Sequence, residues 1–125
     1  MVRAENLAGP YQVAFQNGTQ SGVADTAAGK GGSGQGFRPH ELLEAALASC
    51  MVMTLRMYAE RHAIDHTGIG VAVRLDRTDP EHPVFESAVS FPADFPAGSR
   101  GRMLQVAQRC PVHRTLAAGF GFRTV

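Results

Sequence analysis

The chain carries two cysteines, and each stands where a thiol can do chemistry. Cys50 falls inside a long apolar stretch with helical spacing, and Cys110 begins the tetrapeptide Cys110-Pro111-Val112-His113. Two cysteines far apart in sequence can staple a fold, hold part of a metal site, or form a redox couple in which one sulfur is oxidised and the other resolves it as a disulfide. The surrounding residues favour the redox couple.

A zinc site is the main alternative for a cysteine pair in a chain with five histidines. No Cys-x-x-Cys is present, and the histidines show no ligand spacing next to an acid. His62 and His66 are four residues apart, but Gly68 follows at once and the predicted helix is ending there. We therefore expect no metal and no cofactor.

The neighbours of Cys50 on an ideal helix, at about 100° per residue, are mostly apolar. Apolar burial raises the pKa of a thiol and leaves it inert, so a reactive Cys50 needs a nearby cation. Arg38, just before the predicted helix, is the favoured candidate, with His40 and Arg56 as weaker ones. Glu41 could orient Arg38, although it projects about 180° away from Cys50. The residues that share the face of Cys50 are Leu43, Ala46, Leu47, Met53, Thr54 and Met57.

Each candidate also has a purely structural interpretation. Cys50 could be a small buried hydrophobe, and Cys110 a packing residue in the cap region where one helix follows another. Glu41 and Glu44 stand in the first turns of the predicted helix, where acidic side chains complement the helix dipole. His113 could tune Cys110 or lie at the surface, and we expect the surface position. The redox interpretation therefore needs the two cysteines to work as a pair.

The hydrophobic pattern predicts an α+β fold in a single domain, residues 1–125. There is no internal repeat and no regular alternation of strands and helices, which argues against a doubly wound sheet. The Gly-rich segment 27–36 is predicted to be a mobile loop. The predicted elements are strands at 11–15 and around Val23, joined by an Asn17-Gly18 turn, a helix at 41–63, strands at 71–76 and 84–91, helices at 100–109 and 111–118, and a last strand at 120–125.

Composition narrows the function classes. The chain has 125 residues, 44% of them hydrophobic, and a net charge of +1 without a basic cluster, which argues against a nucleic-acid partner. We expect no membrane span, because no stretch of about twenty apolar residues stands out. The first nine residues lack the apolar core of a secretory signal, so a cytoplasmic location is expected. Structural disulfides are rare in that compartment, which again favours redox chemistry.

The predicted central helix is apolar on nearly all sides. Its polar residues Glu44, Arg56, Glu60 and Arg61 lie mostly towards the two ends. Its middle must therefore be covered by protein on several sides, which a small domain rarely manages without a partner chain.

Two segments together carry a family resemblance. The run Pro39 to Cys50, PHELLEAALASC, and the run Arg109 to Leu116, RCPVHRTL, place the two cysteines 60 positions apart (110 minus 50). In this they resemble the OsmC/Ohr family of thiol peroxidases. The resemblance implies an OsmC-like fold in which central apolar helices pack against antiparallel sheets in an intertwined homodimer.

The resemblance also implies a reaction. Cys50 would attack the distal oxygen of an organic or lipid hydroperoxide, giving an alcohol and a cysteine sulfenic acid. Cys110 would condense with the sulfenic acid to an intramolecular disulfide, and a dithiol reductant would restore both thiols. Such a protein would serve in defence against oxidative stress, and an apolar pocket would favour alkyl or fatty-acid hydroperoxides over hydrogen peroxide.

The motif departs from the best characterised branch of the family at the activating pair. That branch has a glutamate directly after the proline that begins the helix, and an arginine in the hairpin loop. Here His40 follows the proline, and the hairpin turn 16–21 has no arginine. The Pro-x-Glu-Leu-Leu form resembles a less characterised branch, in which Glu41 would replace the usual glutamate and Arg38 the usual arginine.

Two other functions stay open on the sequence. The chain could be a non-enzymatic OsmC-like protein whose apolar cleft binds a hydrophobic small molecule, with Cys50 as lining. It could also be a structural or stress-associated protein in which Cys50 and Cys110 are core residues. A thiol pKa near or above that of free cysteine would favour the binding protein. Resistance of both native thiols to alkylation would favour the structural protein.

Overall fold

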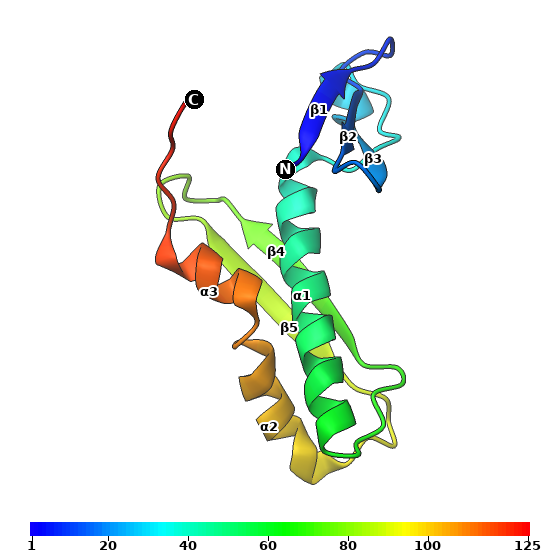
Figure 1. Cartoon of the computed structure of the whole chain (residues 1–125), viewed down its shortest axis with the longest axis vertical. Helices are drawn as coiled ribbons and strands as arrows, with labels where there is room; N and C mark the ends of the chain where they lie inside the picture. The colour runs from blue at the N-terminus through cyan, green and yellow to red at the C-terminus, as the bar shows by residue number, and fades with distance from the viewer. The chain divides into compact units, whose positions relative to one another are not determined.

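The structure is a computed structural model that describes residues 1–125, and it divides into two compact units, Met1–Leu43 and Glu44–Val125. The mixed α+β class with antiparallel sheets is confirmed, whereas the single domain stays a prediction. The elements in chain order are β1 (Arg3–Asn6), β2 (Val13–Gln16), β3 (Ser21–Ala24), the short 3₁₀ helix η1 (Ala28–Lys30), α1 (Pro39–Arg61), β4 (Gly70–Asp76), β5 (Val84–Ser90), α2 (Ala97–Ala107) and α3 (Pro111–Ala118) (Figure 1).

The first unit is built on a three-stranded antiparallel sheet in the order β1-β2-β3. The predicted hairpin of β2 and β3 is confirmed, and its turn depends on two residues. The Asn17 side chain accepts the backbone N–H groups of Thr19 and Gln20, and Gly18 adopts φ +102°, a conformation that favours glycine. β1 was not predicted, because all four of its residues are exposed and show no apolar alternation.

The Gly-rich loop between β3 and α1 is held by one buried carboxylate. Asp25 is 3% exposed, and its oxygens accept hydrogen bonds from the backbone N–H groups of Thr26 at 2.7 Å and Gln35 at 3.3 Å and from the Ser33 hydroxyl. The Ser33 hydroxyl is the largest cause that lowers the pKa of Asp25. The predicted loop is therefore present, but Asp25 anchors both of its ends.

The second unit has its core between α1, α2 and the β4–β5 hairpin (Figure 1). The hairpin follows the predicted alternation, since Val71, Val73, Phe85 and Val89 pack against the core while Ala72 and other alternate residues are exposed. The fully or nearly fully buried side chains of this core are Leu47, Met51, Leu55, Ala59, Phe95, Met103, Val106, Ala107 and Cys110.

Helix α1 starts and ends two residues earlier than predicted. Pro39 takes its first position, where the missing N–H costs nothing. On length and composition alone α1 is apolar enough to cross a membrane, with a mean hydropathy of 1.3 over its best 18 residues, which the sequence analysis did not anticipate. Only 22% of that window is buried, and the α1 side chains Leu55 and Ala59 are fully buried in the core of the second unit.

The predicted final strand at 120–125 is wrong. These residues form no strand, and Phe122 is 99% exposed. A strand exists only where a neighbouring edge supplies hydrogen bonds, and Gly119 and Gly121 favour irregular backbone. The two preceding helices are confirmed, α3 with the predicted bounds and α2 starting three residues earlier, directly after Pro96.

Candidate active site

Cys50 lies in the middle of α1 on a face that the second unit covers only partly. Its side chain contacts the core from the edge, whereas Ala46, Met53 and Met57 on the same face are exposed. Met53 is 60% exposed and Met57 57%. The spacing of three and four residues puts these four side chains on one stripe of the helix. Cys50 thus stands where buried core meets exposed apolar surface.

Cys110 is fully buried and caps helix α3 with its own sulfur. Its backbone is extended (φ −62°, ψ 146°), Pro111 begins the helix, and the Sγ accepts the backbone N–H of His113 at 3.2 Å. An N-cap side chain satisfies one of the otherwise unpaired N–H groups at the start of a helix. His113 therefore acts on Cys110 through its backbone rather than its ring.

The fold brings the two cysteines together. Cys50 packs against the core cluster to which Cys110 belongs, and both are free thiols. The pKa of Cys110 is raised, chiefly by burial and further by interaction with the neighbouring Cys50 thiol, while the His113 N–H opposes the shift. Two sulfurs in one core, one partly accessible and one covered, are what a couple that cycles through a disulfide requires.

Arg38 and Glu41 form a second pair, in the first unit. One carboxylate oxygen of Glu41 accepts the Nε of Arg38 at 2.8 Å and also bonds the terminal nitrogen, while the other accepts the Arg38 backbone N–H at 2.9 Å. Glu41 is the third residue of α1 and Arg38 precedes the helix, so the backbone contact is half of a capping box. These contacts, the backbone one first, lower the pKa of Glu41. Glu41 therefore holds Arg38 at the start of α1, while the action of this pair on Cys50 stays a prediction.

Arg56, a weaker cation candidate, and His62, from the rejected zinc pair, have other partners. The guanidinium of Arg56 pairs with Glu60, Nε to Oε1 at 2.8 Å, and the ring of His62 stacks on Tyr58 with 4.0 Å between ring centres. No three His, Cys, Asp or Glu side chains cluster as a metal site would require.

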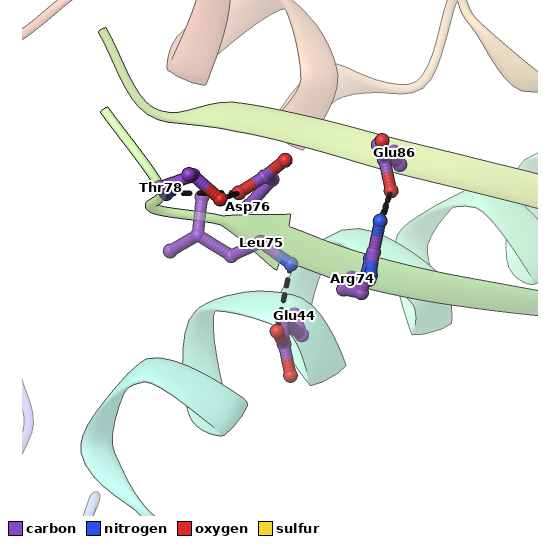
Figure 2. A network of polar contacts seen from close by, with 6 residues as sticks. All are labelled: Glu44, Arg74, Leu75, Asp76, Thr78 and Glu86. Carbon is purple, nitrogen blue, oxygen red and sulfur yellow. Dashed lines mark hydrogen bonds and ion pairs between the residues drawn. The ribbon is translucent and has the colours of Figure 1, made fainter. Parts of the chain in front are cut away.

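Glu44 has a role that its place in the sequence did not predict. We expected it to complement the helix dipole, but its Oε1 accepts the backbone N–H of Leu75 at 2.7 Å (Figure 2). That N–H lies on the edge of β4 that β5 does not pair. No local pattern could reveal this contact, because it joins residues 31 apart in sequence. Glu44 thereby ties α1 to the hairpin next to the cross-strand pair Arg74–Glu86.

The first unit also contains an open cavity of about 670 Å³. Its wall is mixed: Phe15, Val23, Phe37 and Leu42 supply apolar surface, and Glu41 contributes a carboxylate. Phe15 lies opposite Gly22, where an added Cβ would come within 2.5 Å of the far end of its ring, so a larger residue there would displace the Phe15 side chain.

Comparison with known proteins agrees with this fold. Residues 31–124 match the family model described as OsmC-like protein. Because the match covers most of the chain, both cysteines included, the chain belongs to the OsmC-like family, and the resemblance inferred from its two motifs is confirmed. No curated protein sequence matches the chain.

Solved structures share the fold at low identity. An osmotic stress induced and detoxification response protein from Psychrobacter arcticus aligns with TM-score 0.72 and 22% identity, over 91% of this chain and 85% of that one. An organic hydroperoxide resistance protein OsmC from Legionella pneumophila aligns with TM-score 0.66 and 18% identity, over 93% of this chain and 87% of that one. The organic hydroperoxide resistance protein OhrB of Bacillus subtilis aligns with TM-score 0.59 and 21% identity, over 92% of this chain and 87% of that one.

Proposed function

We propose that the chain is a thiol-dependent reductase of organic hydroperoxides, acting in the cytoplasm as a homodimer. The observation that carries the proposal is the meeting of Cys50 and Cys110 in one core, with unequal access to the two sulfurs. Membership of the OsmC-like family supports it, as do the similar folds of two proteins named for organic hydroperoxide resistance.

The proposed reaction has two steps on the protein. The Cys50 thiolate attacks the distal peroxide oxygen, the O–O bond breaks, and the alkoxide takes a proton and leaves as the alcohol. The resulting sulfenic acid at Cys50 then condenses with the Cys110 thiol, which releases water and forms the disulfide. A dithiol reductant restores the two thiols. No cofactor enters the scheme.

Burial of Cys110 suits a resolving role. Because burial raises its pKa, Cys110 stays protonated at neutral pH and does not compete with Cys50 for the peroxide. Full burial also keeps it away from oxidants in solution. Its sulfur meets an oxidant only as the sulfenic acid of its neighbour Cys50.

We assign to Arg38 the role of the cation that favours the Cys50 thiolate, and to Glu41 the role of positioning Arg38. The support is the two-point contact of the Arg38 guanidinium with one Glu41 oxygen and the backbone contact with the other, which fix the arginine at the start of α1. An arginine held in this way keeps its charge at every physiological pH.

The apolar stripe Ala46, Cys50, Met53 and Met57 supports both the dimer and the substrate class. A second copy would cover exposed Met53 and Met57, which removes apolar surface from water. Where the stripe lines the approach to Cys50 at the edge of such an interface, a peroxide meets mainly methionine side chains. Alkyl and fatty-acid hydroperoxides should therefore react faster than hydrogen peroxide.

The test is a thiol count. Reduced protein is mixed with cumene hydroperoxide without external thiol, and free thiols and intact mass are followed. The proposal requires loss of two thiols per peroxide and an intramolecular Cys50–Cys110 disulfide. Cys50→Ser should show no rapid oxidation, and Cys110→Ser should lose its one thiol and then over-oxidise. Ser49→Ala, which removes an exposed hydroxyl that bonds only the helix backbone, is the matched control.

The same experiment distinguishes the rival functions. Intact thiols after exposure to peroxide, with Cys50 open to alkylation, would favour a non-enzymatic binding protein. Two thiols that both resist alkylation in the native state would favour a structural role for the pair.

A further inference from the structure

We infer that an external thiol which reopens the Cys50–Cys110 disulfide attacks the sulfur of Cys50, so that Cys110 is the leaving thiolate. The inference rests on the proposed function, because it concerns the oxidised state of the same couple. It stands on two observations, the unequal access to the two sulfurs and the position of Cys110 at the start of α3.

Access favours Cys50. A thiolate must approach the sulfur it attacks in line with the S–S bond, so a covered sulfur reacts only after the fold moves. Cys110 has no exposed surface and lies in the core with Met103 and Ala107, whereas Cys50 is partly exposed. Association with a second copy removes accessible surface and cannot uncover Cys110. A path to Cys50 must exist wherever peroxide reaches it.

The start of α3 reduces the cost of releasing Cys110 as the leaving thiolate. Its Sγ already accepts the His113 N–H at 3.2 Å, and the N-terminus of a helix carries a partial positive charge. Both stabilise negative charge on this sulfur. Burial acts in the opposite direction and raises the pKa of Cys110, so the cap offsets part of the cost of releasing a thiolate inside the core.

The step balances with a dithiol as the only co-reactant. One reductant sulfur, as thiolate, bonds to the Cys50 Sγ while the Cys50–Cys110 bond breaks. The electron pair of that bond goes to the Cys110 Sγ, which then takes a proton from solvent. The second reductant thiolate attacks the reductant sulfur in the mixed disulfide, which releases the Cys50 thiolate and leaves the reductant as its own disulfide. Two electrons pass from the reductant to the protein.

The experiment maps the first mixed disulfide on the full chain. The Cys50–Cys110 disulfide is formed with cumene hydroperoxide and, in parallel, with diamide, so a failure of the peroxidase reaction stays separate from a failure of this inference. Glutathione is added, the reaction is stopped with acid at short times, and the adduct is located by peptide mass spectrometry. We expect glutathione on Cys50. Glutathione mainly on Cys110 overturns the inference.

If the mixed disulfide with glutathione does not accumulate, variants that keep only one thiol test the inference instead. Native Cys110→Ser and Cys50→Ser are reacted with an aromatic disulfide reagent, and release of its coloured thiol is timed. Cys50 should react at least about tenfold faster than Cys110, since only Cys50 is accessible. Equal or reversed rates would mean that α3 opens readily, and would overturn the inference. Circular dichroism checks folding, and alanine at either position provides a second variant.

Discussion

The Oε1 of Glu44 on α1 accepts the backbone N–H of Leu75 on β4 at 2.7 Å, which joins the central helix to the unpaired edge of the hairpin (Figure 2). A carboxylate that satisfies a strand-edge N–H replaces the neighbouring strand that would otherwise do so. The contact holds in place the helix that carries Cys50.

Replacing Glu44 tests this link. Glu44→Ala leaves the Leu75 N–H without its partner and should lower the free energy of unfolding by about 1–3 kcal/mol. Glu44→Gln keeps an oxygen that can accept the bond and should lose less. Urea unfolding at neutral pH measures both variants. Equal stability of Glu44→Ala and the unmodified chain would show that the contact adds nothing.

The two faces of α1 should respond differently to truncation. Leu55 is fully buried, so Leu55→Ala should cost about 2–5 kcal/mol of unfolding free energy, from lost apolar burial and the cavity left behind. Chemical unfolding followed by circular dichroism gives the value. If Leu55→Ala lowered the unfolding free energy no more than a substitution at an exposed site does, Leu55 would not be a core residue.

Met53 provides the matched control on the opposite face. Met53→Ala, at a side chain 60% exposed, should leave the stability of the dilute chain nearly unchanged. In the proposed homodimer it should instead weaken self-association, measured by light scattering across a concentration series. An unmodified chain that stays monomeric at high concentration would rule out the dimer.

The Asp25 carboxylate should make the first unit sensitive to acid. Because its folded-state pKa lies below the ordinary value of 3.8, the ionised group stabilises the fold above that value, and this stabilisation is lost as pH falls through the folded pKa. Asp25→Asn should therefore exchange amide hydrogens faster in the loop at neutral pH. The difference from the unmodified chain should shrink in acid. A difference independent of pH would point to packing instead.

Arg38→Ala should slow the reaction of Cys50 with iodoacetamide at neutral pH, because the proposed cation is gone. Glu41→Gln keeps the charge of Arg38 but weakens its anchoring and should have a smaller effect. The readout is the alkylation rate of Cys50 in a Cys110→Ser background. Arg56→Ala, which removes a cation paired with Glu60, is the control. An unchanged rate in Arg38→Ala would exclude Arg38 as the activating residue.

Local pattern was enough to predict most of the elements. The helix period located α1 and α3, the alternation of Val71 and Val73 located β4, and Asn17-Gly18 located the hairpin turn. The prediction missed β1 and wrongly placed a strand at 120–125 for the same reason. Whether a segment forms a strand depends on a neighbouring strand edge, which a short stretch of sequence does not contain. The exposed residues of β1 pair with β2, whereas exposed Phe122 has no such edge.

The sequence could predict which residue types form the candidate site. It could not predict the contacts that those residues make with partners distant in sequence. Motif spacing singled out Cys50, Cys110, Arg38 and Glu41. It could not indicate that Cys110 would cap α3 through its sulfur, because cysteine is a rare N-cap and the contact needs the fold's backbone geometry.

The anchoring of the Gly-rich loop by Asp25 has a consequence for protein engineering. Since no side chain from 27 to 36 is buried, the loop depends on its hydrogen bonds to Asp25 rather than on packing. At Gly29 an added Cβ meets nothing within 4 Å, so this position should accept a fluorophore or an affinity tag. Gly32 should not, because a Cβ there would come within 2.3 Å of the Thr26 carbonyl oxygen. Tolerance to sequence change thus differs sharply between glycines three residues apart.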